Sequence, residues 1–167
     1  MEPLLYEIEH GIGTDHFMLY ERENHVFPMH MHRCYEFVLM ISGEMSMQIE
    51  KEKYLLKEGD LVLIKPNRLH SYDTPRGANG KCLICVFSHD LIAAVSESLV
   101  RYKLASPIIQ NLPRFYRDMF EGMNEDKDLA TVKGFLYTVS GLFYQSLDFR
   151  TEDDVAKDTI LLRDIFV

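Results

Sequence analysis

The sequence lacks several features that would assign it to particular classes of protein. It has no run of the roughly eighteen apolar residues that a membrane-spanning helix needs. Its start, Met1–His10, lacks the basic and apolar regions of a signal peptide, so we expect no membrane partner. Cations are scarce: 18 Lys and Arg against 26 Asp and Glu give a formal net charge of −8. Because phosphate binding needs clustered cations, this charge argues against a nucleic-acid-binding surface within these 167 residues.

Cysteine is also rare, and the number is odd. Cys34 stands alone, while Cys82 and Cys85 form a Cys-x-x-Cys inside an apolar run. Such a motif indicates zinc or redox chemistry only with a second pair or a thioredoxin-like context, and neither is present. We therefore interpret all three as small apolar core residues, and we expect the reducing environment of the cytoplasm.

The first half of the chain has the pattern of a β protein. Short apolar runs alternate with turn residues, and Glu44–Glu50 shows a strict period of two. Eight runs have strand length: 4–9, 16–22, 34–42, 44–50, 53–57, 60–65, 69–73 and 81–87. Strands at this spacing, with no helical period between them, predict a sandwich or barrel over residues 1–88.

After residue 88 the apolar spacing becomes helical. Three helices are predicted, with these inward residues: Leu91, Ile92, Val95 and Leu99; then Phe115, Tyr116, Met119, Phe120 and Met123; then Leu129, Val132, Leu136, Val139 and Phe143. Gly134 and Gly141 lie on a separate stripe of the third helix, although glycine costs a helix interior about 1 kcal/mol relative to alanine. Close approach of a second backbone, from a dimer partner, would explain them. Packing beneath the barrel is the alternative.

The end of the chain predicts one more helix. Thr151–Asp154 has the form of a capping box before an apolar-periodic run that reaches Val167 without a stop signal. Either the chain is a fragment of a longer protein, or a terminal helix docks on the core.

The pattern H-x-H-x3-E-x6-G, which ends at Gly43, is the sharpest in the sequence. If its first part is one strand, His30, His32 and Glu36 share parity and face the same side. Two imidazoles and a carboxylate suit Fe, Mn, Ni or Zn with open coordination positions. His70, from a distant strand, would complete a site of three histidines and one glutamate.

These motifs resemble those of the cupin superfamily, small double-stranded β-helix barrels. The resemblance implies His30, His32, Glu36 and His70 as ligands of a divalent metal. Asn24 replaces the usual leading glycine, and the second motif is one residue short and has Thr74 where asparagine is usual. Asparagine tolerates the left-handed backbone conformation that glycine adopts, so the first change is modest.

The runs 29–39, 54–66 and 70–72 resemble, more narrowly, the N-terminal domain of AraC-type transcription regulators. In that family a cupin barrel precedes a helical dimerisation region and two DNA-binding helix-turn-helix motifs. The resemblance implies a cupin-like sensing barrel over 1–88 and a helical dimerisation and linker region over 89–167. It places the DNA-binding domain beyond residue 167.

The expected function is therefore small-molecule effector sensing by a homodimer, with DNA bound only through the part beyond 167. By strand parity, Val38 and Met40 would form an apolar wall beside Glu36, and Tyr72 would close over the effector, unless these three simply fill the core. The four metal candidates would then bind a metal, contact the effector directly, or form a hydrogen-bonded polar cluster. The other histidines are expected at the surface or in turns: His10, His16, His25 and His89. The alternatives are a metal-dependent cupin enzyme, an oxygenase or isomerase, and a stand-alone binding or storage cupin.

Overall fold

The computed structural model describes residues 5, 6 and 15–151 of the chain, and the side chains of residues 15–148. The strands are β1 (Leu5–Tyr6), β2 (Phe17–Glu23), β3 (Val26–Met31), β4 (Tyr35–Ser42), β5 (Glu44–Ile49), β6 (Glu52–Lys57), β7 (Leu61–Ile64), β8 (His70–Asp73), β9 (Lys81–Phe87), β10 (Tyr102–Leu104), β11 (Ile108–Ile109) and β12 (Leu147–Thr151). The helices are the 3-10 helix η1 (His89–Ile92), α1 (Ala93–Arg101), α2 (Arg114–Glu121) and α3 (Leu129–Tyr144).

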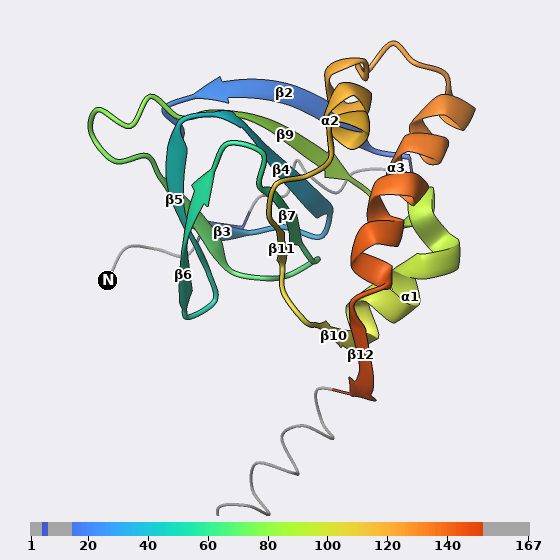
Figure 1. The fold of residues 1–167 in the computed structure, drawn as a ribbon. Coiled ribbons are helices and arrows are strands. Elements are labelled where there is room, and N and C mark those ends of the chain that lie inside the picture. Colours follow the sequence, from blue (N-terminus) through green and yellow to red (C-terminus); the bar gives the residue numbers. More distant parts are fainter. Residues whose placement is uncertain (1–4, 7–14, 152–167) are drawn as a thin grey trace, which may run out of the picture.

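Two five-stranded sheets face each other and enclose one of the two hydrophobic cores of the protein. Their strand orders are β1-β3-β8-β5-β6 and β11-β7-β4-β9-β2. Figure 1 shows these sheets on one side of the molecule and the helices α1, α2 and α3 gathered on the other. The mainly β architecture followed by helices is thus confirmed, with β9 ending at Phe87 and η1 beginning at His89. The division into two domains stays a prediction, and β11 of the later segment pairs with β7 of the barrel.

Strand β3 is absent from the sequence prediction, which also placed the first part of the metal motif on one strand. Both points need correction. His30 lies on β3, His32 lies in the turn that follows, and Glu36 lies on β4. Pro28 hides the strand pattern because proline is tolerated only at edges and bulges, and the β3–β8 pairing shifts register between Phe27 and His30.

The interior between the sheets is filled mostly by apolar side chains, which we call the inner cluster. Its buried members are Cys34, Val38, Met40, Met45, Met47, Leu56, Val62, Ile64, Tyr72, Cys82, Ile84 and Val86. Cys85 is buried on the opposite face of β9, in the core under the helices. All three cysteines are free and buried, so their interpretation as core residues is confirmed. Burial raises the pKa of the Cys82 thiol to about 12, which leaves it unreactive.

The helices pack on the outer face of the sheet that contains β4. Phe37 of β4 meets Phe120 of α2 and Phe143 of α3, with ring centroids 6.1 and 6.0 Å apart. Two residues predicted to point inward do not: Phe115 is 66% exposed, and Leu129, the first residue of α3, is 53% exposed. The α2 and α3 patterns otherwise place their apolar faces on this core.

The stripe of small residues on α3 faces away from the protein's own core. A Cβ built on Gly134 or Gly141 would meet no atom of the described residues within 4 Å, so packing beneath the barrel is wrong as their explanation. Leu136, one of the residues predicted to point inward, is fully buried in the core under the helices and does not belong to this stripe. Thr151, the first residue of the predicted capping box, ends strand β12, and the helix predicted after it lies outside the described residues.

Candidate metal and ligand site

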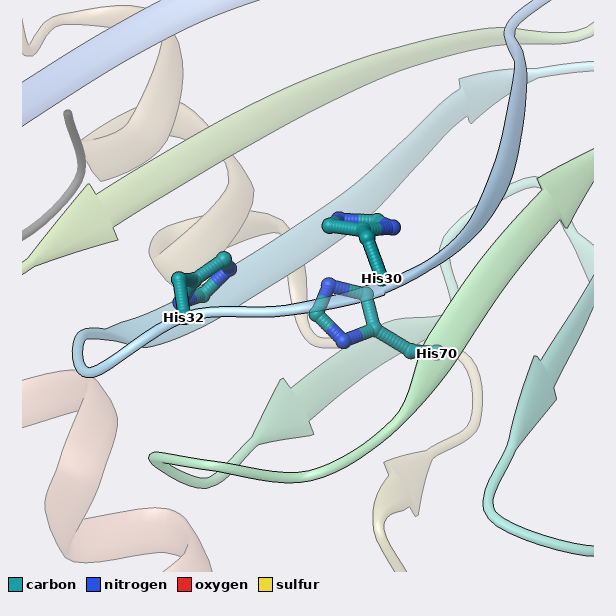
Figure 2. Close-up of side chains that lie close together, drawn as sticks. All are labelled: His30, His32 and His70. Carbon is teal, nitrogen blue, oxygen red and sulfur yellow. The ribbon is translucent and has the colours of Figure 1, made fainter. Parts of the chain in front are cut away.

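Three buried histidines converge between the sheets. One ring nitrogen of each of His30, His32 and His70 lies within 4.8 Å of those of the other two. Figure 2 shows the rings gathered from two facing backbone segments, with His30 and His32 on one and His70 on the other. The β3–β8 register places His30 directly opposite His70, and their ring centroids are 4.0 Å apart. The convergence expected from the motif is therefore present, although it arises from a turn rather than from one strand.

The backbone fixes the tautomer of all three rings. Nδ1 lies 2.8 Å from the Pro28 carbonyl in His30, 3.0 Å from the Cys34 carbonyl in His32 and 2.8 Å from the Arg68 carbonyl in His70. A carbonyl oxygen only accepts hydrogen bonds, so each Nδ1 carries the proton. In the neutral ring, Nε2 then presents a lone pair, which is the state that binds a metal.

Glu36 lies among these rings and is itself buried. Its Oε2 is 2.8 Å from Nε2 of His32 and 3.7 Å from Nε2 of His70, and the Tyr72 hydroxyl donates to Oε1. Burial by itself would raise the pKa of Glu36, but hydrogen bonds with His32 and His70 outweigh it and hold that pKa well below its usual range. Glu36 is therefore an anion that accepts a hydrogen bond from the Tyr72 hydroxyl and lies beside the His32 and His70 rings.

The donor set fits a divalent metal. With Nδ1 protonated, His32 donates from Nε2 to Glu36 only as an imidazolium. Otherwise its lone pair faces the carboxylate, an arrangement that a shared cation stabilises. Burial, and after it the charge of His70, lowers the pKa of His30 to about 4, so this ring is neutral near pH 7. Three imidazoles and one carboxylate suit Zn, Ni, Fe or Mn, as the sequence motif predicts.

A cavity of about 260 Å³ opens beside this cluster. Its lining residues are Tyr20, Arg22, His25, Phe27, Glu36, Tyr72 and Ile84. Glu36 and Tyr72 belong to both the cavity and the cluster, so a guest here would rest against the histidine site. The structure thus places these two predicted ligand-binding residues together with His30, His32 and His70.

Val38 and Met40 do not line this cavity. Both are fully buried in the inner cluster, where they fill the core as the alternative interpretation had it. They share parity with Glu36, but parity fixes only the face of the sheet and not the position along the barrel.

The cavity residues on β2, on β3, in the turn between them and on β9 were not predicted from the sequence. Tyr20 and Arg22 alternate along β2 with outward residues, and Tyr20 pairs with Ile84 of β9. That alternation was a usable signal. His25 was expected only at the surface or in a turn, and it does follow the turn residue Asn24, yet its ring centroid lies 4.9 Å from that of Tyr72.

Two of the departures from the cupin pattern, Asn24 and Thr74, have structural roles beside the cavity. Asn24 has φ of +48°, the left-handed conformation that a leading glycine would adopt. Thr74 donates from Oγ1 to the His25 carbonyl at 2.8 Å, and its own backbone N–H donates to the same oxygen. Together they hold the turn that carries His25 against β8.

The chain belongs to the family of AraC-like ligand-binding domains, whose model matches residues 15–129. This assignment confirms the narrower of the two resemblances seen in the sequence motifs. No curated protein matches the chain in sequence. No helix among the described residues has the length and hydropathy that crossing a membrane requires.

The fold resembles that of ToxT from Vibrio cholerae. Its structure with a bound unsaturated fatty acid is 12% identical and superimposes with a TM-score of 0.57, covering 80% of this chain and 55% of ToxT. A second crystal form, also 12% identical, gives a TM-score of 0.54 and covers 84% of this chain and 61% of ToxT. The cupin-like two-sheet fold is therefore confirmed, and the chain spans little more than half of the ToxT chain.

Proposed function

We propose that this chain is the effector-sensing and dimerisation domain of an AraC-type transcription regulator. The observation that carries the proposal is the cavity between the sheets, where a polar cluster meets an aromatic wall in a domain of the AraC-like ligand-binding family. Ligand sites of this kind combine an apolar lining with a few convergent polar groups. Regulation of transcription in the cytoplasm follows from the same proposal.

The structure offers a physical route from the cavity to the helices. The Tyr35 hydroxyl of β4 donates to the Ser96 carbonyl of α1 at 2.9 Å. Lys65, which follows β7, donates to the Tyr102 carbonyl at the end of α1 at 2.6 Å. An effector that binds one arrangement of barrel and helices more tightly shifts the population toward it, by no more than its differential binding energy.

Two partners complete the proposal. A second copy of the chain would pack on α3, within the region 113–147, where Gly134 and Gly141 are open to close approach. DNA would be bound only through a domain that follows residue 167, since the net charge of this chain is −8.

A metal-dependent cupin enzyme is the second candidate, and the tautomers of the three histidines favour it. A metal held by His30, His32, His70 and Glu36 would act as a Lewis acid on a substrate in the adjoining cavity. Metal-dependent turnover of a small molecule by the purified chain would favour this candidate over the sensor.

Native mass spectrometry of the purified chain tests the proposed function. We expect a bound small molecule whose occupancy falls in Phe27→Trp, because the larger ring fills the cavity beside His30. Val26→Trp is the matched control. Val26 is next to Phe27 in the sequence but is 63% exposed and does not line the cavity, so the larger ring should leave the cavity open. Equal occupancy in both variants would contradict a sensing site inside the barrel.

A further inference from the structure

The charge of the cavity lining is unbalanced at its outer end. Glu36 accepts a hydrogen bond from the Tyr72 hydroxyl and lies 2.8 Å from Nε2 of His32, so its negative charge is held at the inner end of the cavity. Arg22 is the other formally charged residue in the lining. Among residues 15–148, whose side chains the structure describes, it has no ion pair, and its hydrogen bond goes to the neighbouring Glu21 carbonyl. Arg22 is an exposed residue at the rim of the cavity, where its guanidinium is available to pair with an anion.

The Arg22 guanidinium also contacts an aromatic ring of the same strand. Its central carbon lies 4.3 Å from the centroid of the Tyr20 ring, a cation–π contact. A guanidinium can donate two parallel hydrogen bonds to a carboxylate. Lysine, a point charge on a flexible stem, would not give the same selectivity for a planar anion.

The rest of the cavity sets the shape and direction of the guest. His25, Phe27 and Tyr72 supply flat faces, and Ile84 supplies an aliphatic one. Its volume of about 260 Å³ exceeds the roughly 150 Å³ that accommodates benzene, and it lies below the usual range for larger ligands. Ionised Glu36 repels a second carboxylate, so the acid group of the guest lies toward Arg22 and its apolar body toward Tyr72.

From these observations we propose that the effector is a small aromatic carboxylate, held by Arg22 at the outer end of the barrel cavity. The proposal rests on the proposed sensing function and names the chemical class of its ligand.

Three probes with one ring and different charge test this class: phenylacetate, phenylacetamide and 2-phenylethylamine. Binding to the chain is measured by calorimetry in a buffer with a chelator, so that no metal contributes. A hydrogen bond to a charged group is worth about 1.5–3 kcal/mol, so phenylacetate should bind about tenfold or more tightly than the amide, and the amine weakest. Arg22→Gln should reduce the preference for phenylacetate over the amide to about threefold or less.

Arg114→Gln is the control variant, because Arg114 is an exposed arginine on α2 that pairs with Asp118. It should keep the full preference. Tightest binding of the amine, or an unchanged preference in Arg22→Gln, would overturn the assignment of an anion to Arg22. A long-chain fatty acid that binds more tightly than phenylacetate would overturn the size argument.

The outcomes also separate this inference from the proposed function. If no probe binds but a neutral or cationic guest occupies the cavity of the purified protein, the ligand class is wrong and the sensing function stands. If the cavity of the purified protein holds no guest and no probe binds, both are wrong.

Discussion

A nearby backbone carbonyl sets the tautomer of each histidine in the cluster. The Pro28, Cys34 and Arg68 carbonyls fix the Nδ1 protons and leave the Nε2 atoms as ligands. In every case the acceptor residue is two positions away from the histidine, so a local backbone feature sets the tautomer. Cluster and cavity then share Glu36 and Tyr72, which couples any bound metal to any bound guest.

The first prediction at this scale concerns metal binding. The purified chain should take up a single zinc ion, and His30→Ala should weaken that binding by about tenfold or more. His89→Ala should leave it unchanged, because His89 is an exposed residue outside the cluster. Zinc at about 100 times its Kd should stabilise the wild-type fold by about 2.7 kcal/mol, measured by urea unfolding with and without chelator. Equal zinc content in both variants would exclude the histidine cluster as the site.

The second prediction concerns acid. Because the pKa of His30 falls from 6.5 to about 4 on folding, the unfolded chain binds a proton in this interval that the folded chain does not. The metal-free protein should keep its full stability above pH 6.5 and lose stability as the pH falls from 6.5 to 4. Glu36, whose pKa is lowered, adds a loss only below its ordinary value of 4.5. Urea unfolding at a series of pH values below 7 should show both losses of stability. The loss due to His30 should be absent in His30→Gln. A free energy of unfolding that stays constant between pH 6.5 and 4 would contradict the burial of a neutral His30.

Turns and bulges are the elements that place the site residues. The β3 bulge lets both Phe27 and His30 contribute to the site, and the β4–β5 turn brings Gly43 against the loop that precedes β9. Gly43 has φ of +69°, and an added Cβ would fall on the carbonyl oxygens of Ala78 and Asn79, only 2.6 Å from the first.

Gly43→Ala should therefore lose about 2 kcal/mol or more of stability, from backbone strain and from this collision. Gly77→Ala is the matched control: its φ is +82°, but a Cβ there meets nothing within 4 Å. Gly77→Ala should lose only the stability that backbone strain costs, about 1–2 kcal/mol. Thermal or urea unfolding measures both, and equal losses would mean that the β4–β5 turn does not contact the later loop closely.

The sequence could predict elements better than it could predict how they meet. Alternation along Glu44–Glu50 marks β5 because one face of that strand is buried, and spacings of three and four mark α3 for the same reason. The composition of the buried polar cluster was also predictable, since His30, His32, Glu36 and His70 stand in a recognisable motif. Its construction was not, because Pro28 hides β3 and a bulge changes parity within it. The cavity was missed because its lining depends on position along the strands, which one sequence does not reveal.

At the scale of the whole molecule, two cores share one sheet. The inner cluster fills most of the barrel, and the outer face of β4 and β9 carries the helices. The helical layer therefore packs on a sheet that also forms part of the cavity wall. In the proposed function, a guest that repositions β4 would act on α1 through Tyr35 and Ser96.

The dimer prediction belongs to this scale. Gly134→Leu should leave the fold of each chain intact, because an added Cβ meets no described atom within 4 Å. If a second backbone approaches α3 there, the same substitution should weaken dimerisation by about tenfold or more. Glu97→Leu places the same side chain on the exposed side of α1 and should not change the dimer. Sedimentation equilibrium measures both, and an unchanged dimer in Gly134→Leu would exclude this face of α3.

The link between barrel and helices gives one more prediction. Tyr35 is fully buried and bonds to the Ser96 carbonyl and hydroxyl, so Tyr35→Phe should cost about 1–2 kcal/mol of stability. Tyr54→Phe, on β6 far from the helices, should stay within about 0.5 kcal/mol of the wild type in urea unfolding. Equal stability of both variants would show that this link contributes nothing.

A crystal structure of the protein with the small molecule that copurifies with it is the most direct test of a sensing site inside the barrel. We expect the guest to lie between the sheets, with one end at Arg22 and the other against Tyr72 and Glu36. A larger hollow of about 430 Å³, lined by Ser46, Lys53 and Ser71 among others, lies over β5, β6 and β8. A guest bound there, with the barrel cavity empty, would contradict the account.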